Sequence, residues 1–308
     1  MRKALVEALC EIAEKDKRVF VITGDLGYRV LESFQEKFPE RFLNIGVAEA
    51  NLVTVAAGLA TMGFIPFIYS IANFAAIRPF EQIRNDVCLQ NLNVKIIGIG
   101  GGLAYAKAGS THHSLEDIAL MRLLPNMTIV APADPNETYV ATKAIYMHRG
   151  PIYLRCERNP KSNIYEKVPD FKLGKAKEVK KGKKIALLAT GAKVETAQAV
   201  AVILKKHNLD VAIYAFPTIK PLDRKVLSKI SREVKLVITI EEHRIDGGFG
   251  SAVLEYFSEI SSEVKVKRFG IGDEFAGVSA EYDKLIYLYK LTPEQIAKSV
   301  IKLVNKPS

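Results

Sequence analysis

The stretch Asn44-Ile45-Gly46-Val47-Ala48-Glu49-Ala50-Asn51 places one carboxylate at the start of a predicted helix, residues 48–62, that is otherwise almost wholly apolar. The other polar side chains of this helix are Asn51, Thr54 and Thr61. A helix that is apolar all round is typical of a buried position, so we expect Glu49 to be buried as well. Burial disfavours an ionised carboxylate unless it is paired, which indicates that Glu49 has something to hold.

Short β-branched runs alternate with helix-length segments on both sides of this helix. In the first half we predict strands at 19–23, 42–45, 66–69, 94–99, 128–130 and 152–154, with helices at 48–62 and 135–147. This alternation indicates a parallel sheet covered on both faces. It restarts with predicted strands at 185–189, 211–214, 236–240 and 264–269 and helices near 193–206, 223–231, 249–259 and 293–304. The sequence therefore predicts an α/β fold of two domains, 1–160 and a smaller 185–308, joined by a linker at 161–184.

Length and charge agree with this division. The chain has 308 residues, 48% of them hydrophobic and 25% charged, which is enough for two cores. Its net charge is +10, and residues 158–184 alone hold ten Lys or Arg against three acidic residues. No aromatic residues are interleaved there in the way that base stacking needs, so we interpret the segment as a solvated basic linker and expect no nucleic-acid partner.

The sequence also predicts a cytoplasmic location. The N-terminus lacks the apolar core of a signal peptide, and no apolar run reaches the roughly 20 residues of a spanning helix, so no membrane contact is expected. Cys10, Cys88 and Cys156 are scattered without metal-ligand spacing, as in a reducing compartment.

Candidate site residues follow four predicted strands at their carboxyl ends, where open parallel sheets bind ligands. The segments are Thr23-Gly24-Asp25-Leu26-Gly27, the Glu49 stretch, Ser70-Ile71-Ala72-Asn73-Phe74, and Gly100-Gly101-Gly102 with Thr111-His112-His113 downstream. Singly, each has an ordinary explanation: a turn for Asp25, a helix-terminal charge for Glu49, core packing for Phe74 and a surface imidazole for His112. Their joint occurrence predicts one shared crevice.

These segments resemble the thiamine diphosphate-dependent transketolases, and specifically the C-terminal section of transketolases that are split across two genes. The similarity spans nearly the whole chain. Besides the Glu49 stretch and Thr111-His112, it is carried by Thr23-Gly24-Asp25-Leu26, Leu123-Leu124-Pro125-Asn126-Met127, Lys220-Pro221-Leu222-Asp223, Glu241-Glu242-His243 and Gly247-Gly248-Phe249-Gly250. The resemblance implies a pyrimidine-binding domain followed by the transketolase C-terminal domain.

The resemblance also implies roles for individual residues. Glu49 would hydrogen-bond a ring nitrogen of the cofactor's aminopyrimidine and promote the tautomer that removes the thiazolium proton. Phe74 would stack on that ring, and His112 would act on the donor oxygens as the second catalytic residue. The remaining implied positions are Asp25, Leu26, Ile71 and Ile77 at the cofactor, and Arg29, His113 and Arg158 at the substrate, with Arg158 binding its phosphate.

One family motif is missing from the chain. No Gly-Asp-Gly with a downstream asparagine, which binds magnesium and the diphosphate in this family, occurs in the 308 residues. The resemblance therefore implies an enzyme active only with a separate N-terminal subunit. That subunit would bind Mg²⁺, this chain would bind no metal, and two copies of each would form an α2β2 assembly.

Departures from the family pattern concern the substrate. Gly100 and Ala108 replace a histidine and an aspartate that contact donor hydroxyls, while Ile71 and Ile77 replace aromatic residues. Arg29 replaces a serine near the substrate phosphate. Lost hydroxyl contacts change specificity strongly, so the sequence indicates a donor other than a classical ketose phosphate as one possibility.

Three functions stay open at the level of sequence. The first is transfer of a two-carbon ketol or acyl unit between carbonyl compounds by a split transketolase-like enzyme. The second is decarboxylation of a 2-oxo acid with acyl transfer, as in deoxyxylulose phosphate synthases or the beta subunits of 2-oxo acid dehydrogenases. The third is a non-catalytic regulatory or binding subunit, against which the retention of Glu49 argues.

Overall fold

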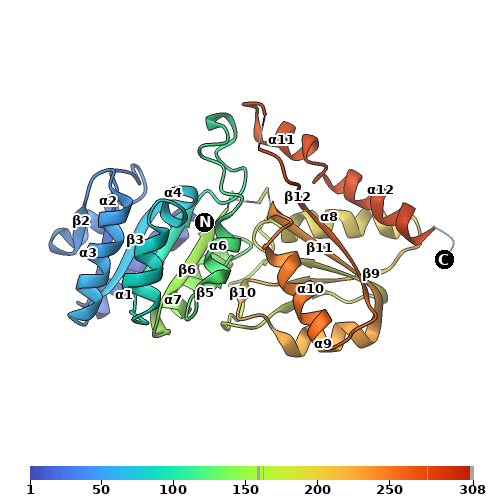
Figure 1. The fold of residues 1–308 in the computed structure, drawn as a ribbon, viewed down its shortest axis with the longest axis horizontal. Coiled ribbons are helices and arrows are strands. Elements are labelled where there is room, and N and C mark those ends of the chain that lie inside the picture. The colour runs from blue at the N-terminus through green and yellow to red at the C-terminus, as the bar shows by residue number, and fades with distance from the viewer. Residues whose placement is uncertain (158–159, 162, 276, 306–308) are drawn as a thin grey trace.

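Two sheets lie side by side in the computed structural model, which describes residues 1–308 except 158–159, 162, 276 and 306–308 (Figure 1). The first half contains α1 (Arg2–Lys15), β1 (Val19–Thr23), α2 (Glu32–Lys37), η1 (Pro39–Arg41), β2 (Phe42–Asn44), α3 (Glu49–Thr61), β3 (Ile65–Ile71), α4 (Ala72–Ala76), α5 (Phe80–Gln82), η2 (Ile83–Cys88), β4 (Lys95–Ile99), η3 (Ala106–Ala108), α6 (Asp117–Leu123), β5 (Thr128–Val130), α7 (Pro135–Met147) and β6 (Ile152–Cys156). The second half contains β7 (Lys177–Lys180), β8 (Lys184–Ala189), α8 (Lys193–Lys206), β9 (Val211–Ala215), β10 (Thr218–Lys220), α9 (Arg224–Glu233), β11 (Val234–Arg244), α10 (Phe249–Glu259), β12 (Lys265–Ile271), α11 (Tyr282–Leu288) and α12 (Pro293–Val304). The predicted α/β fold, with a larger parallel sheet followed by a smaller one, is confirmed.

The larger sheet brings the candidate loops to one edge. Its strand order is β10-β5-β6-β4-β3-β1-β2, and β1 to β6 are all parallel. Thr23, the last residue of β1, is level with Asn44 of β2 and Tyr69 of β3. Ile71 of β3 is in turn level with Ile99 of β4. The loops after these four strands therefore leave the sheet along the same edge.

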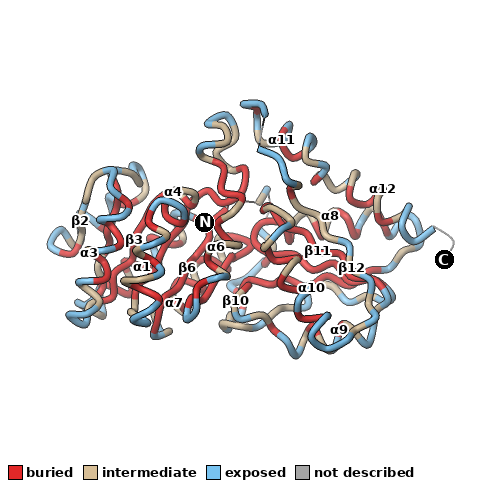
Figure 2. The backbone as a smooth tube through the Cα atoms, viewed as in Figure 1, coloured by how far each residue is buried: buried red, intermediate tan, exposed pale blue. Residues whose placement is uncertain are grey.

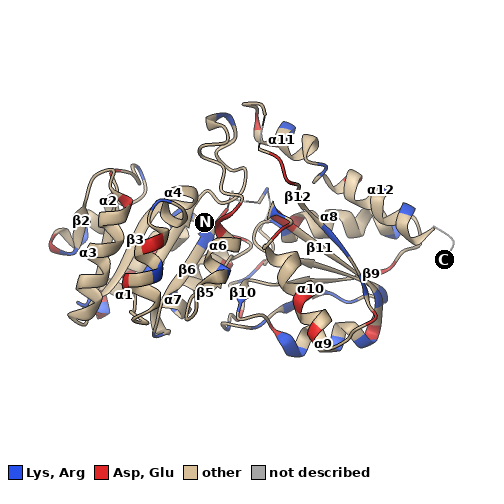
Figure 3. Cartoon of the chain, in the orientation of Figure 1, with Lys and Arg blue, Asp and Glu red and all other residues tan. Residues whose placement is uncertain are grey.

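The smaller sheet has the order β12-β11-β8-β9-β7, and β7 is its antiparallel edge strand. This strand lies inside the segment 161–184 that we predicted as a linker, so that part of the prediction is wrong. The lysines of β7 suit an exposed sheet edge, where charge discourages pairing with another chain, and Lys180 Nζ lies 2.8 Å from Asp210 Oδ1. Helix α9 also carries several basic residues, coloured blue in Figure 3.

The two halves are less separate than two independent cores would be. Strand β10, from the second half, pairs antiparallel with β5 and completes the larger sheet. One hydrophobic cluster also runs from Ile22 and Leu52 in the first half to Leu188 and Phe249 in the second. Figure 2 shows the buried backbone continuing across this boundary. Besides this shared cluster, a second cluster lies mainly in the first half and a third mainly in the second half. Each half therefore has a core of its own, as expected, and the shared cluster joins the two.

Helix α3 is buried on one face only, which corrects the expectation of a helix buried all round. Its buried residues are Glu49, Leu52, Val53, Ala56 and Ala57, whereas Ala50, Asn51, Thr54, Gly58 and Thr61 are exposed. The spacing of the buried residues is that of one helical stripe, because positions three and four apart share a face. Glu49 is thus buried because it begins the stripe that packs on the sheet.

No helix among the described residues is long and apolar enough to cross a membrane.

Candidate functional site

Glu49 is buried at the end of the larger sheet, and it has a charged partner that the sequence did not reveal. Its side chain is 3% exposed, while that of Arg78 is 45% exposed. Arg78 Nη1 lies 2.9 Å from both carboxylate oxygens of Glu49. The predicted burial of Glu49 is therefore confirmed, and Arg78 is the partner that the buried carboxylate has within the chain. Arg78 follows the short helix α4, 29 residues away along the chain, so no local sequence pattern joins the two.

Aromatic rings continue this contact from Arg78 toward His112. The Arg78 guanidinium carbon lies 3.8 Å from the centre of the Phe74 ring. Phe74 meets His112 edge to face at 5.1 Å between ring centres, and Tyr105 lies 6.0 Å from His112 on another side. Three residues predicted from separate loops, Glu49, Phe74 and His112, are thus brought into one chain of contacts.

Backbone and side-chain hydrogen bonds orient the His112 imidazole. His112 Nδ1 lies 3.0 Å from Thr111 Oγ1, and Asn73 Nδ2 donates to the Thr111 carbonyl oxygen at 2.8 Å. Asn73 belongs to α4, the helix that also carries Phe74. The loop with His112 and the helix with Phe74 are therefore fixed to each other next to Glu49.

Asp25 lies in the loop beside the turn that leads into α3. Asn44 Oδ1 accepts from the backbone N–H of Asp25 at 2.9 Å and from that of Gly46 at 3.0 Å. Gly46 has a φ of 77°, a left-handed conformation that favours glycine. Asp25 is exposed, and its Oδ1 accepts from Tyr28 Oη at 2.9 Å. Leu26 is half-buried and packs against the hydrophobic cluster behind β1.

Two pockets flank the contact chain. Ile77, Asn73 and His113 line one of about 280 Å³. His113 is buried and its Nε2 lies 2.9 Å from the Ala106 carbonyl oxygen, while Ile71 is half-buried at the end of β3. The second pocket, of about 770 Å³, is lined by Tyr105 and by three cationic residues, Arg2, Lys3 and Arg29. Sequence reasoning found Arg29 but missed Arg2 and Lys3, because their charges lie far from the other motifs. Arg158 lies outside the described residues.

The loop from Gly100 to Ser114, which carries His112, is anchored by a buried cation. Arg155 of β6 is fully buried, and its Nη2 donates to the Ser114 carbonyl oxygen at 3.1 Å and to that of Glu242 at 2.9 Å. Its Nε donates to Asp117 Oδ2 at 2.7 Å, and its Nη1 pairs with Glu157. Gly101 lies so close that an added Cβ would be 2.8 Å from the Arg155 guanidinium.

One carboxylate and one cation from the second half, Glu242 and Lys193, complete this network. Glu242 Oε1 accepts from the backbone N–H of Leu103 at 2.7 Å, and Glu242 Oε2 lies 2.6 Å from Lys193 Nζ. Burial would raise the pKa of Glu242, but Lys193, together with the Tyr282 hydroxyl and the Leu103 N–H, outweighs burial and holds that pKa below its usual value. Acidic and basic positions gather at this boundary between the sheets (Figure 3). The network therefore ties the His112 loop to both halves of the chain.

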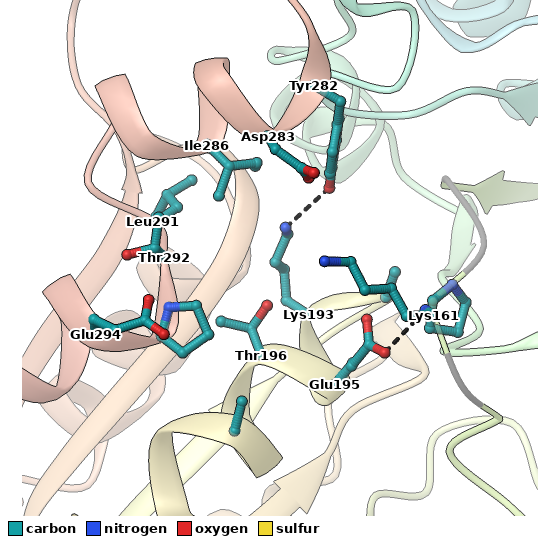
Figure 4. A pocket seen from close by; sticks show the side chains of 14 residues that line it. Lys161, Lys193, Glu195, Thr196, Tyr282, Asp283, Ile286, Leu291, Thr292 and Glu294 are labelled. Atoms are coloured by element: carbon teal, nitrogen blue, oxygen red, sulfur yellow. Dashed lines mark hydrogen bonds between the residues drawn. The ribbon is translucent and has the colours of Figure 1, made fainter. Parts of the chain in front are cut away.

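Another pocket, of about 710 Å³, lies among α8, α11 and α12, away from Glu49. Figure 4 shows Lys193 pointing across it toward Tyr282, with Lys161 and Glu195 along one side. Lys193 Nζ forms an ion pair with Glu242 and donates to Tyr282 Oη at 3.1 Å. Since its walls carry both charge signs and its buried cation is paired, this pocket offers no arranged chemistry comparable to the Glu49 site. Among the described residues, no three His, Cys, Asp or Glu side chains are grouped to hold a metal ion.

Comparisons with known proteins match both halves of the chain. Residues 1–161 match the family model "Transketolase, pyrimidine binding domain", and residues 174–296 match "Transketolase, C-terminal domain". A putative transketolase C-terminal section from Methanocaldococcus jannaschii is 39% identical over 99% of this chain and 96% of its own length. One of the subunits of the apulose-4-phosphate transketolase of Phocaeicola vulgatus is 34% identical over 99% of this chain and 97% of its own length.

A longer relative and a solved structure are also similar. The 1-deoxy-D-xylulose-5-phosphate synthase of Clostridium tetani is 36% identical over 98% of this chain, which covers 48% of that protein. A structure described as a split gene transketolase, inactive beta4 tetramer, superposes with a TM-score of 0.90 at 36% identity, over 98% of this chain and 97% of its own.

The buried network predicts a large penalty for Arg155→Met. This change leaves Asp117 and Glu157 buried without their cation, and breaking such a pair costs about 3–5 kcal/mol. The free energy of unfolding, measured in urea, should fall accordingly. Lys37→Met is the control, because its pair with Glu14 is exposed and should contribute little. A loss for Arg155→Met no greater than that for Lys37→Met would contradict the role of the network.

Proposed function

Since the chain belongs to the transketolase family, with the pyrimidine-binding and C-terminal domains in one polypeptide, we propose that it binds the aminopyrimidine of thiamine diphosphate through Glu49 and Phe74. As one subunit of a split enzyme, it would take part in moving a two-carbon ketol or acyl unit between carbonyl compounds. Thiamine diphosphate, when bound, supplies the electron sink for such a transfer.

A single observation carries this proposal. A flat guanidinium with N–H donors already fits between the Phe74 ring, at 3.8 Å, and both oxygens of Glu49, at 2.9 Å. A flat aminopyrimidine, which has an aromatic face and hydrogen-bonding groups at its edge, needs the same two kinds of contact. The residues present therefore fit the pyrimidine end of the cofactor.

The roles of the protein groups follow from their places in the site. Glu49 would hold a proton at a ring nitrogen, where its burial strengthens the hydrogen bond. Phe74 would fix the plane of the ring. His112, oriented by Thr111 and packed on Phe74, would donate to or accept from the oxygen of a bound donor. Asp25, Leu26, Ile71 and Ile77 would form the outer walls.

Cationic side chains near Tyr105 support an anionic substrate. Arg2, Lys3 and Arg29 line the 770 Å³ pocket that adjoins the His112 side of the contact chain. Arg and Lys at such a pocket suit a phosphate or another anionic end group. The relative named as an apulose-4-phosphate transketolase subunit favours a sugar phosphate-like substrate. Besides Arg29, we propose His113 and Arg158 as substrate contacts.

We further propose that the charged end of the cofactor is bound elsewhere. The sequence lacks the Gly-Asp-Gly motif for magnesium and diphosphate, and the relatives of matching length are named as a section or a subunit of a transketolase. An N-terminal subunit would bind Mg²⁺ and the diphosphate, and two copies of each chain would form the cytoplasmic enzyme.

A second candidate is decarboxylation of a 2-oxo acid with transfer of the acyl unit. The similarity to 1-deoxy-D-xylulose-5-phosphate synthase favours it, as do the apolar Ile71 and Ile77 and the absence of the donor-hydroxyl contacts at Gly100 and Ala108. Release of carbon dioxide from pyruvate by the purified pair of subunits would favour this candidate, and transfer from a ketose phosphate without gas release would exclude it.

Glu49→Gln should abolish the transfer reaction while leaving the fold intact. The change is nearly isosteric, but an amide does not replace the carboxylate at the ring nitrogen. Turnover is measured with the reconstituted subunits, and circular dichroism checks the fold. Asp86→Asn, which changes a half-buried acid near the far side of α3, is the matched control and should retain turnover. Normal turnover in Glu49→Gln would refute the assigned role.

The isolated chain should bind thiamine diphosphate weakly, because it offers contacts to the pyrimidine end alone. Isothermal titration in the presence of Mg²⁺ is expected to give a dissociation constant at least about a hundredfold higher than that of the two-subunit complex, since the diphosphate contacts are missing. Equally tight, magnesium-dependent binding by the lone chain would contradict the two-subunit proposal.

A further inference from the structure

We propose that Arg78 is an internal substitute for the aminopyrimidine, which the cofactor must displace before it can reach Glu49 and Phe74. The inference rests on the proposed function, because it concerns the same ring-binding site. In this proposal Arg78 competes with the cofactor, so cofactor binding includes a conformational step in which Arg78 leaves Glu49 and Phe74.

The contacts of Arg78 are those that the ring would need. The guanidinium is planar, lies 3.8 Å from the centre of the Phe74 ring, and donates to both oxygens of Glu49 at 2.9 Å. Stacking of Arg on an aromatic face and donation to a carboxylate are each favourable. Because one aromatic face and one pair of oxygens are involved, the guanidinium and an aminopyrimidine exclude each other.

The two partners of this ion pair differ in their freedom to move. The Glu49 side chain is 3% exposed, on the stripe of α3 that packs on the sheet. The Arg78 side chain is 45% exposed, just beyond the end of α4. Rotation of Arg78 into water keeps its charge solvated, whereas the buried Glu49 side chain cannot reach water by a similar rotation. Arg78 is therefore the member of the pair that moves.

An exchange of partners keeps the buried carboxylate satisfied throughout. Glu49 without a donor would be a buried, unpaired charge, which is costly. With Arg78 in place, the carboxylate stays paired and the Phe74 face stays covered until a ring replaces the guanidinium. Cofactor binding then competes with the Arg78 contacts. Only molecules in which Arg78 has left Glu49 can bind the ring, so the apparent dissociation constant is the intrinsic one divided by the fraction of such molecules.

Removal of the competitor should tighten cofactor binding. In the complex reconstituted with the N-terminal section, Arg78→Ala is expected to lower the dissociation constant of thiamine diphosphate roughly tenfold, the factor that a half-exposed ion pair and one cation–π contact suggest. Arg78→Lys keeps the charge but loses the planar stack, so an intermediate value is expected. Arg84→Ala, which removes a cation that donates to Asn85 in the neighbouring segment, is the control and should match the unaltered complex.

Binding that is unchanged or weaker in Arg78→Ala, while the unaltered complex binds the cofactor, would overturn the role of Arg78 and leave the proposed function standing. An unaltered complex that binds no thiamine diphosphate would overturn the proposed function, and this inference with it.

The isolated chain provides a readout without any cofactor. Glu49→Gln, Arg78→Ala and the double variant form a cycle in which the melting temperature is measured. Non-additive shifts, with the Arg78→Ala loss reduced once Glu49 is neutral, support the pair. Strictly additive shifts would show that the two side chains do not interact in solution and would overturn the inference.

Discussion

The site depends on Glu49, a buried carboxylate at the carboxyl end of a parallel sheet. Because a buried charge without a partner is costly, Glu49 needs a hydrogen-bond donor at all times. Its position is fixed by the stripe of α3 that packs on the sheet and by the Asn44–Gly46 turn that precedes the helix. Any planar group that donates at its edge and stacks on Phe74 can fill this need. Arg78 does so from within the chain, and a cofactor ring has the right chemistry to do so from outside.

A second constraint holds the loop that carries His112. His112 lies on a loop whose ends pair with each other at Gly102 and Ser114, and Arg155 donates to the Ser114 carbonyl oxygen. Arg155 also contacts Asp117 from the first half and Glu242 from the second. Ions buried this deeply tolerate little displacement, since each lost contact leaves a charge without compensation. The C-terminal half thus contributes to the site through the His112 loop, because Glu242 accepts from the Leu103 N–H of that loop and pairs with Lys193.

Local patterns predicted most of the fold and the centre of the site. The ten expected strands exist, most of them as short apolar runs in the sheet interiors, although β2 and β12 lie at sheet edges. Glu49 was found because a carboxylate is unusual on an apolar helix. Strand β7 was missed because it is a lysine-rich edge strand without an apolar pattern, and β10 was missed because it has only three residues. Arg78 and Arg2 were missed for a different reason, since only the folded chain brings these cations next to the other site residues.

The most direct test of the Glu49 site is a crystal structure of this chain, assembled with the proposed N-terminal subunit, with thiamine diphosphate and Mg²⁺ bound. The aminopyrimidine should stack on Phe74 with a ring nitrogen within hydrogen-bond distance of a Glu49 oxygen, with Arg78 turned away and the diphosphate on the other subunit. An aminopyrimidine bound elsewhere, with the Glu49–Arg78 pair still closed, would contradict it.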